Sequence, residues 1–359
     1  MLYPRLKSFT RFGSTGDITL VRESGTCFHL ADPTGQVATL LDLCDGTRSA
    51  TDIHVALRDN WPELALGDVT EGIAALDTAG LLENERAANT LDDRQRARYA
   101  SNLAFFGTFA SCGRSRYAAQ EALRRAHVVQ LGVGGVGSSV LYNLAGLGVG
   151  RITTLDCDVV ELKNLSRQFL YDENDVGRSK IACAAARVRA LNSDVTVTPV
   201  ERQVTGPADI ADLLPGADLL ISVIDQPLDV QSWVNEAAVA AGVPVIAGGM
   251  TVTRGVYWSM SPGASGCLAC RSPKLSMPAP VTVADRVNRA IGPAAGVIGS
   301  LIALEAVRYL TGFAPPISAA TLWRIDLSTS QVEIGETWER RPDCPVCRHH
   351  PISGEGAQA

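Results

Sequence analysis

Hydrophobic and polar residues follow two different rhythms along the chain, and the change falls near Ala126. From there, apolar runs of strand length alternate with helical stretches, a pattern typical of a doubly wound, Rossmann-like, mostly parallel α/β sheet. The expected strands cover residues 126–133, 151–158, 195–202, 217–225 and 243–250, and the expected helices cover 138–147, 179–191 and 231–241. Antiparallel strands are expected within 253–262 and 321–334, with a long apolar helix between them at 292–312.

The first part of the chain has its own pattern. Two short strands, at 17–24 and 26–32, precede three short helices that end near Gly46, Trp61 and Gly80. A charged stretch follows. We therefore expect a small α+β domain over residues 1–86, a linker with the first helices of the larger domain over 87–125, that larger domain over 126–350 and a disordered tail over 351–359.

Composition restricts the class of protein. The 359 residues are 46% hydrophobic and 19% charged, which suits a globular chain with a large core. The net charge of −6 argues against nucleic acid or an anionic membrane as the main partner. We see no apolar run of the roughly 18 residues that a membrane span needs, and the basic N-terminus lacks the apolar segment of a signal peptide. The expected location is cytoplasmic.

A glycine-rich turn joins the first expected strand of the large domain to a helix. The stretch "VVQLGVGGVGSSV" places Gly132, Gly134, Gly135 and Gly137 in a G-x-G-x-x-G spacing, which brings bare backbone close to a nucleotide phosphate. Asp156 ends the next strand, about 20 residues on, where a dinucleotide enzyme holds the ribose. Both NAD and ATP fit these residues.

The residues after Asp156 favour ATP cleaved between its α and β phosphates. Arg167 offers bidentate donors, Lys180 a compact positive charge and Asn164 an amide donor for a pentavalent phosphorus and a departing pyrophosphate. Asp225 ends a later strand at the edge of the sheet where ligands bind, and its carboxylate suits Mg²⁺. Asp158 and Gln168 are further candidate nucleotide contacts, with ordinary loop positions as an equal alternative.

Four of the nine cysteines form two C-x-x-C pairs. Cys267 and Cys270 make the first pair, and Cys344 and Cys347 make the second. Four thiolates fill the tetrahedral coordination of Zn²⁺ and leave no position for water, so we expect a structural zinc that clasps two distant segments.

Taken in order, these motifs resemble the family of adenylating enzymes that activate ubiquitin-like and sulfur-carrier proteins, the ThiF/MoeB type. The resemblance covers roughly residues 90–350 and runs through "GVGGVGS", "DCDVVELKNLSRQF", "VGRSK", "SVIDQ", "GCLAC", "GVIGSLIALEAVRYLTG" and "CPVC". It implies that Asp156 holds the ribose of ATP, that Asn164, Arg167 and Lys180 hold the phosphates, and that Asp225 serves Mg²⁺.

Two departures from this family stand out. Relatives carry an arginine that reaches across a homodimer, but Ser101 stands at its place, which leaves Arg98 or Arg96 as substitutes and weakens the inferred homodimer. Relatives also often carry an acyl-accepting cysteine after the first zinc pair, and no cysteine lies between Cys270 and Cys344. Cys112 is the one remaining candidate in a loop. The sequence therefore favours an acyl-adenylate that is not passed to a cysteine of this chain.

The small domain resembles the PqqD-like peptide-binding module, the RiPP recognition element, through "LLDLCDGTRSATDI" at Leu40–Ile53. Such modules are winged-helix-like and bind a leader peptide as an added strand at the edge of their sheet. The resemblance places six apolar side chains near that peptide or, as an even alternative, in the core: Ile18, Leu20, Val21, Val69, Ile73 and Leu76.

A leader-binding module joined to an adenylating domain predicts ATP-dependent adenylation of a carboxyl group on a ribosomally made precursor peptide, with release of pyrophosphate. This resembles the peptide-modifying enzymes of the microcin C7 and pantocin types. One alternative is a non-catalytic partner that presents the leader to a cyclodehydratase, and another is an activator of a sulfur-carrier protein. The loop from Ser272 to Ala290 is expected to cover the substrate.

Overall fold

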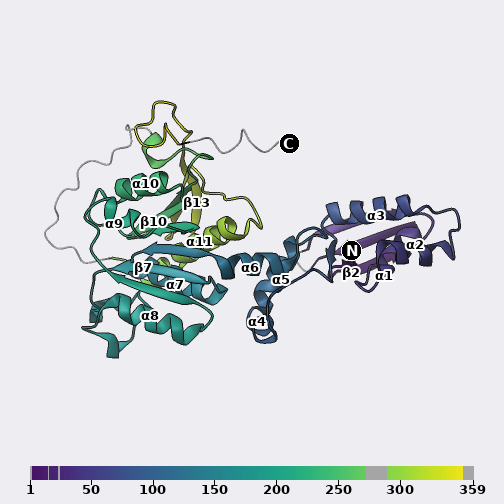
Figure 1. Ribbon diagram of the computed structural model, residues 1–359, viewed down its shortest axis with the longest axis horizontal. Helices are drawn as coiled ribbons and strands as arrows, with labels where there is room; N and C mark the ends of the chain where they lie inside the picture. The colour runs from purple at the N-terminus through teal and green to yellow at the C-terminus, as the bar shows by residue number, and fades with distance from the viewer. Residues whose placement is uncertain (1, 15, 23–24, 272–288, 351–359) are drawn as a thin grey trace. The chain divides into compact units, whose positions relative to one another are not determined.

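The chain divides into two compact units, Met1–Glu121 and Ala122–Ala359, each with its own sheet and hydrophobic core (Figure 1). The computed structural model describes residues 2–14, 16–22, 25–271 and 289–350. The expected tail at 351–359 and nearly all of the expected covering loop lie outside the described residues. The domain boundaries expected near residues 86 and 125 differ from this division by contacts and remain predictions.

The first unit contains two small sheets and six helices or parts of helices. Strands β2, β3 and β4 form an antiparallel sheet in that order, and β1 pairs with β5. The elements are β1 Pro4–Leu6, β2 Thr10–Ser14, β3 Gly16–Val21, β4 Cys27–Asp32, α1 Gln36–Leu43, α2 Ala50–Arg58, α3 Leu66–Thr78, β5 Leu82–Asn84, α4 Asp93–Arg98, α5 Ala100–Phe109 and α6 Arg116–Arg125, whose last residues belong to the second unit. Helix α2 begins at Ser49 because Ser49 and Asp52 form a capping box.

The charged stretch after residue 86 folds onto the small sheets. The Lys7 ammonium donates to the carbonyl oxygen of Ala110, 2.5 Å away at the C-terminal end of α5, where a helix favours positive charge. The backbone N–H of Cys112 donates to the Asp77 carboxylate at 2.7 Å. Helix α5 and the start of α6 are therefore held by the residues that precede them.

A buried carboxylate strengthens this attachment. Glu83 on β5 pairs with Arg5 on β1 and with Arg116 on α6, each at 2.5 Å, and the Glu83 side chain is only 5% exposed. Burial alone would raise the pKa of the Glu83 carboxyl, but the hydrogen bonds and charges of Arg116 and Arg5 outweigh it and hold this pKa below its ordinary value. Folding therefore favours the ionised form of Glu83.

We expect the stability of this unit to depend on the charge of Glu83. Because its pKa is lower in the folded chain, its contribution is complete above the unfolded value of about 4.3 and is lost as the pH falls through the lower folded value. Glu83→Gln should lower the free energy of unfolding at neutral pH by about 3 kcal/mol, since two arginines lose their counter-charge. Thermal unfolding between pH 3 and 7 measures both effects.

Asp42→Asn is the matched control for Glu83→Gln. The Asp42 carboxylate also pairs with an arginine, Arg11, but it is 69% exposed, so its removal should change stability by less than about 0.5 kcal/mol. Equal destabilisation by the two variants would contradict the importance of the buried pair.

The second unit is a sheet of eight strands in the order β13-β12-β11-β10-β9-β6-β7-β8. Strands β8, β7, β6, β9 and β10 are parallel, whereas β11, β12 and β13 are antiparallel. The elements are β6 His127–Leu131, α7 Gly135–Leu147, β7 Arg151–Asp156, η1 Leu162–Asn164, η2 Glu173–Asp175, α8 Lys180–Leu191, β8 Thr196–Glu201, α9 Ala208–Ala211, β9 Leu219–Ser222, α10 Val230–Ala241, β10 Val245–Thr251, β11 Arg254–Met260, η3 Leu268–Cys270, α11 Gly292–Thr311, β12 Thr321–Asp326 and β13 Gln331–Thr337. The doubly wound sheet with a small α+β unit before it confirms the predicted fold class.

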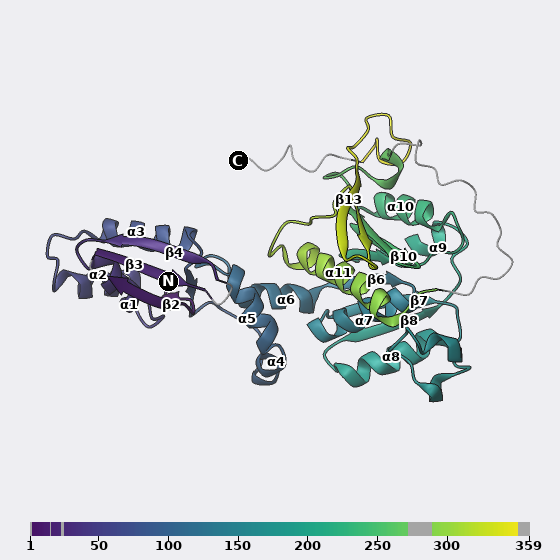
Figure 2. The same cartoon turned by 180° about the vertical axis from the view of Figure 1, so that it is seen from behind.

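Helices cover both faces of this sheet. Helices α7, α8 and α11 lie on one face, and α9 and α10 lie on the other (Figures 1 and 2). The chain passes from β6 outward to β7 and β8 and then returns to β9 on the other side of β6. In open α/β sheets, ligands bind at the carboxyl ends of the strands where the order reverses in this way. The topology therefore directs attention to the loops that follow β6 and β9.

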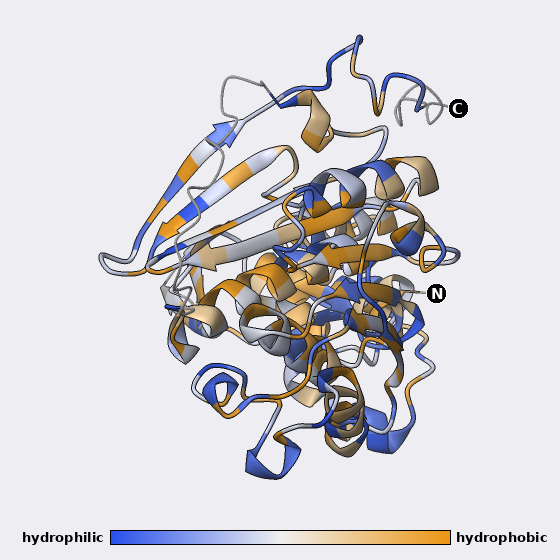
Figure 3. Cartoon of the chain, turned by 90° about the vertical axis from the view of Figure 1, so that its left-hand side faces the viewer, coloured by the Kyte–Doolittle hydropathy of each residue, from blue (hydrophilic) through white to orange (hydrophobic). Residues whose placement is uncertain are grey.

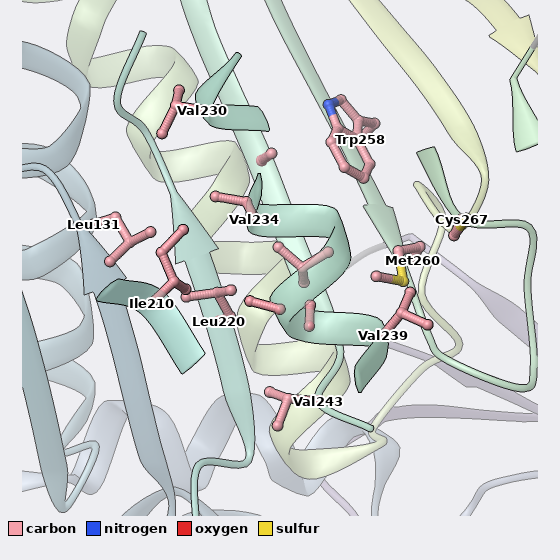
Figure 4. Close-up of a cluster of buried hydrophobic side chains, with 14 of the residues drawn as sticks. Leu131, Ile210, Leu220, Val230, Val234, Val239, Val243, Trp258, Met260 and Cys267 are labelled. Carbon is pink, nitrogen blue, oxygen red and sulfur yellow. The ribbon is translucent and has the colours of Figure 1, made fainter. Parts of the chain in front are cut away.

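The core explains the hydrophobic rhythm of the sequence. Leu131, Leu220, Val234 and Met260 belong to a buried cluster between the sheet and α10, which also includes the four paired cysteines (Figure 4). The β12–β13 hairpin instead alternates hydrophobic and hydrophilic residues (Figure 3), and on β13 the hydrophobic Val332 and Ile334 are exposed as well.

One apolar helix has the length of a membrane span. Among the described residues, helix α11 is long and apolar enough to cross a membrane by length and composition, although Glu305 and Arg308 interrupt its apolar sequence. Gly299 of α11 lies where an added Cβ would be 2.6 Å from Ser139 on α7, and Gly255 of β11 is similarly close to Ile298 of α11. These contacts show that α11 packs as a core helix.

Candidate functional site

The glycine-rich turn lies between β6 and α7, as the sequence predicts. Gly132 has a φ of +95°, in the left-handed region that favours glycine, and an added Cβ would lie 2.6 Å from the Ile224 side chain. A Cβ on Gly137 would lie 2.2 Å from the carbonyl oxygen of Gly132. These two glycines allow the start of α7 to pack tightly against the turn. The turn presents the first N–H groups of α7, which have no partners within the helix, at the edge of the sheet.

Asp156 ends β7 next to this turn. Its carboxylate accepts hydrogen bonds from the backbone N–H groups of Val133 and Asp158, each at 2.9 Å. The structure thus brings Asp156 and the glycine turn together. Asp158 is exposed, and its carboxylate forms an ion pair with the Lys180 ammonium at 2.7 Å. The Lys180 side chain is only 7% exposed. Both residues of this pair were predicted as site residues.

The segment after β7 folds back onto the turn. The Tyr171 hydroxyl donates to the carbonyl oxygen of Val133 at 2.9 Å, and an added Cβ on Gly135 would lie 3.7 Å from the Arg167 side chain. Arg167 is half-buried and donates to the carbonyl oxygen of Lys163 at 3.0 Å. These contacts place Arg167 beside the glycine turn.

Two buried amides lie in the same segment. The Asn164 side chain accepts a hydrogen bond from the backbone N–H of Glu161 at 3.0 Å, which closes the short helix η1. The Gln168 side chain is 3% exposed, and its Nε2 lies 3.9 Å from the position of a Cβ on Gly134. Within the part of the chain that the structure describes, the Gln168 Oε1 has no hydrogen-bond partner. A buried polar atom of this kind next to a phosphate-binding turn suits a site that holds a polar ligand.

Asp225 follows β9, the strand beside β6, and is exposed. Gln231 at the start of α10 donates to the carbonyl oxygen of Ile224 at 2.7 Å, which fixes the backbone just before Asp225. Because Ile224 contacts the position of Gly132, this loop lies against the glycine turn. The carboxylate is therefore at the edge of the sheet that the topology selects.

The four paired cysteines form a closed cluster. All four are buried, and their sulfurs lie within 4.8 Å of one another. Three of the Sγ–Sγ distances are 3.9 Å for Cys267–Cys270, 3.6 Å for Cys267–Cys344 and 3.4 Å for Cys270–Cys347. Four sulfurs around one Zn²⁺ at 2.3 Å would be about 3.8 Å apart. The cluster suits a tetrahedral zinc ion, as the spacing of the cysteines predicts.

The structure also shows the surroundings of several secondary candidates. Burial, followed by the nearby Asp77 carboxylate, raises the pKa of the Cys112 thiol to about 12, the opposite of an activated thiol. Five of the six apolar residues suggested near a leader peptide are buried in the core of the first unit, and only Val21 is partly exposed: Ile18, Leu20, Val69, Ile73 and Leu76 are the buried ones. Arg96 is engaged with Asp93 and with the carbonyl oxygen of Leu91.

Sequence reasoning missed two residues that support the turn. Tyr171 was not singled out, although it bonds the loop directly. Gln130 is a polar residue inside the apolar run "HVVQL" and is fully buried in β6. A polar side chain in the middle of a buried parallel strand was the available signal.

Comparisons with known proteins agree with this arrangement. The ThiF family model matches residues 99–346. The sulfur carrier protein adenylyltransferase of Thermus thermophilus is 34% identical over 245 residues, which cover 66% of this chain and 87% of that protein. The molybdopterin-synthase adenylyltransferase of Salmonella typhimurium is 32% identical over 262 residues, 72% of this chain and 98% of that protein.

Solved structures extend the likeness to the first unit. The crystal structure of E. coli MccB has a TM-score of 0.79 with 20% identity and covers 99% of both chains. The structure of MccB with ATP has a TM-score of 0.76 with 21% identity over 96% of this chain and 99% of that chain. PaaA has a TM-score of 0.70 with 20% identity over 92% of this chain and 99% of that chain. At these identities the likeness shows the fold.

Proposed function

The chain belongs to the ThiF family and is an adenylyltransferase, and from that premise we propose that it activates a carboxyl group on a ribosomally made precursor peptide with ATP. The observation that carries the proposal is the extent of each likeness. The family model begins at residue 99, whereas the fold of MccB covers nearly the whole chain, including the first unit. Solved structures of MccB contain MccA or N-formylated MccA.

In this proposal the peptide carboxylate attacks the α-phosphorus of ATP, and pyrophosphate leaves. The N–H groups at the start of α7 bind phosphate oxygens, and Asp156 holds the ribose. Arg167 lies beside Gly135 and neutralises the charge that develops on the phosphorus. Lys180 exchanges its contact with the exposed Asp158 carboxylate for a phosphate oxygen. Asn164 and Gln168 complete the polar wall.

The residues present fit Mg²⁺, which binds proteins through one or two carboxylates and the phosphates of its substrate. Asp225 offers an exposed carboxylate at the edge of the sheet and is the residue that would hold the ion. When bound, Mg²⁺ supplies positive charge to the departing pyrophosphate. The zinc ion that we assign to Cys267, Cys270, Cys344 and Cys347 has no open position and acts in structure alone.

The first unit supplies the proposed contact with the leader part of the peptide. Its three-stranded sheet has two outer strands, β2 and β4, whose outer backbone groups are available for an added strand. The apolar residues under this sheet are core, so we propose that backbone pairing at an outer strand gives the main contact. The homodimer inferred from the family also stays a proposal, which the mass of the chain in solution tests.

The experiment is ATP–pyrophosphate exchange with the full chain, Mg²⁺ and candidate precursor peptides. We expect exchange that depends on one peptide, with AMP as a later product. If no peptide supports exchange while a separate modifying enzyme works faster in the presence of the chain, the chain presents the leader and does not activate it.

A second candidate is activation of a sulfur-carrier protein, because relatives at 33–34% identity carry that activity in their names. The absence of cysteine from positions 271–343 counts against transfer through a thioester on this chain. Exchange that depends on a small protein ending in Gly-Gly, and on no peptide, would favour this candidate.

A further inference from the structure

The buried side chain of Gln130 contacts the backbone of the glycine turn. Gln130 lies in β6 between Val129 and Leu131, and its side chain is completely buried. The side-chain Nε2 donates to two backbone carbonyl oxygens, those of Gly132 and Gly137, each at 2.9 Å. One amide group therefore connects the end of the strand with the first turn of α7.

These two carbonyls set the shape of the turn. Gly132 begins the turn in its left-handed conformation, and Gly137 packs so closely against it that no side chain fits between them. The backbone N–H groups of Gly132 and Val133 are fixed from the other side by Leu155 and Asp156. The Ser138 hydroxyl of α7 also donates to the carbonyl oxygens of Val133 and Gly134, but Gln130 is the residue whose side chain joins Gly132 to Gly137 from the strand, and so it helps to determine where the N–H groups between them point.

Stability alone does not explain an amide at this position. Among the described residues, the Gln130 Oε1 has no hydrogen-bond partner, and the same holds for the hydroxyl of Thr154. Thr154 is the register partner of Gln130 on the neighbouring strand β7 and is also completely buried. A buried, unpaired polar atom costs about as much as one hydrogen bond contributes, so the unpaired Oε1 offsets part of what the two Nε2 hydrogen bonds add to stability.

We infer that Gln130 is a positioning residue for the nucleotide: it holds the glycine turn in the shape that directs the N–H groups of α7 toward the phosphates. The inference rests on the proposed binding of ATP at this turn, and it assigns no direct contact between Gln130 and the substrate. It predicts different effects on the two substrates. Loss of the amide should weaken ATP binding and leave peptide binding unchanged.

Gln130→Met in the full chain tests this difference, because methionine has a similar length and no donor. We expect the Kd for a non-hydrolysable ATP analogue to rise about tenfold. In free energy this corresponds to the loss of one to two hydrogen bonds. The KM for ATP in pyrophosphate exchange should rise with it, while the KM for the peptide stays unchanged. The midpoint of thermal unfolding without nucleotide should fall by a few degrees, because the carbonyl oxygens of Gly132 and Gly137 lose a donor, so affinities are compared at a temperature at which both proteins are folded.

Thr154→Val is the matched control. It removes the neighbouring unpaired hydroxyl from the same buried layer and makes no contact with the turn, so the unfolding midpoint should rise and the ATP affinity should not change. Gln130→Asn keeps an amide that is one methylene too short to reach both carbonyls, and it should lose ATP affinity as Gln130→Met does.

Three results overturn the inference: unchanged ATP affinity in Gln130→Met, normal affinity in Gln130→Asn, or an equal loss of ATP affinity and peptide affinity. Wild-type chain that does not bind ATP overturns it as well. If the wild type binds ATP and no peptide supports exchange, the proposed function fails, and the Kd values still decide the role of Gln130.

Discussion

Replacing Arg167 with alanine is expected to reduce ATP–pyrophosphate exchange by about 100- to 1,000-fold, the loss typical when one group that stabilises transition-state charge is removed. Arg167 lies beside Gly135 at the start of α7, where the phosphates of ATP would meet the helix. Its planar guanidinium offers two parallel donors to phosphate oxygens. Exchange assays with saturating peptide measure kcat, and titration with labelled peptide measures leader affinity, which should not change.

Two further variants sharpen this prediction. Arg167→Lys keeps the charge and loses the bidentate geometry, so it should recover only part of the activity. Arg178→Ala removes an arginine from the same region that pairs with Asp175 and is 58% exposed, and it should leave exchange within a few-fold of the wild type. Equal losses in Arg167→Ala and Arg178→Ala, or a parallel loss of peptide binding, would remove Arg167 from the proposed chemistry.

The centre of the sheet was predictable because its strands β6 and β9 are buried on both faces. Runs such as Val128–Leu131 and Leu219–Ile221 are apolar enough to be recognised without their neighbours, and the helices between them have one apolar stripe. The glycine turn was predictable because part of its requirement for glycine arises within the turn. Gly132 has a left-handed φ, and a Cβ on Gly137 would meet the carbonyl oxygen of Gly132.

Elements held by distant partners were harder to predict. Strand β1 has only three residues, and it is defined by pairing with β5 nearly 80 positions away. Helix α5 directly follows a stretch rich in arginine and aspartate, so the buried stripe that begins at Tyr99 and continues in α5 with Leu103 and Phe106 was not recognised. The pairing of Lys180 with Asp158, and the supporting roles of Gln130 and Tyr171, likewise depend on three-dimensional contacts.

The four cysteines form the second site at which a small change should have a large effect. The cluster joins the segment at η3 to the turn at 344–347, and between them lie α11 and the hairpin β12–β13. Metal binding by four thiolates contributes apparent free energies of about 10–16 kcal/mol in small zinc domains. A clasp that closes more than seventy residues of chain should therefore contribute strongly to the folded state of the second unit.

Cys344→Ser should abolish the stoichiometric zinc and lower the free energy of unfolding by more than about 3 kcal/mol, because it leaves three buried thiols without their metal. Metal analysis of the purified chain measures the zinc, and thermal unfolding with and without a chelator measures the stability. Cys157→Ser is the matched control, since Cys157 is exposed and lies outside the cluster, and it should retain one zinc per chain.

Two outcomes would change this interpretation. If the purified chain contains no zinc under reducing conditions, and Cys344→Ser does not change its stability, the buried thiols pack here without a metal. A chain that loses its zinc and keeps exchange activity at low temperature would instead show that the zinc ion supports the fold and takes no part in forming the adenylate. This is the outcome expected from a site with four protein ligands and no open position.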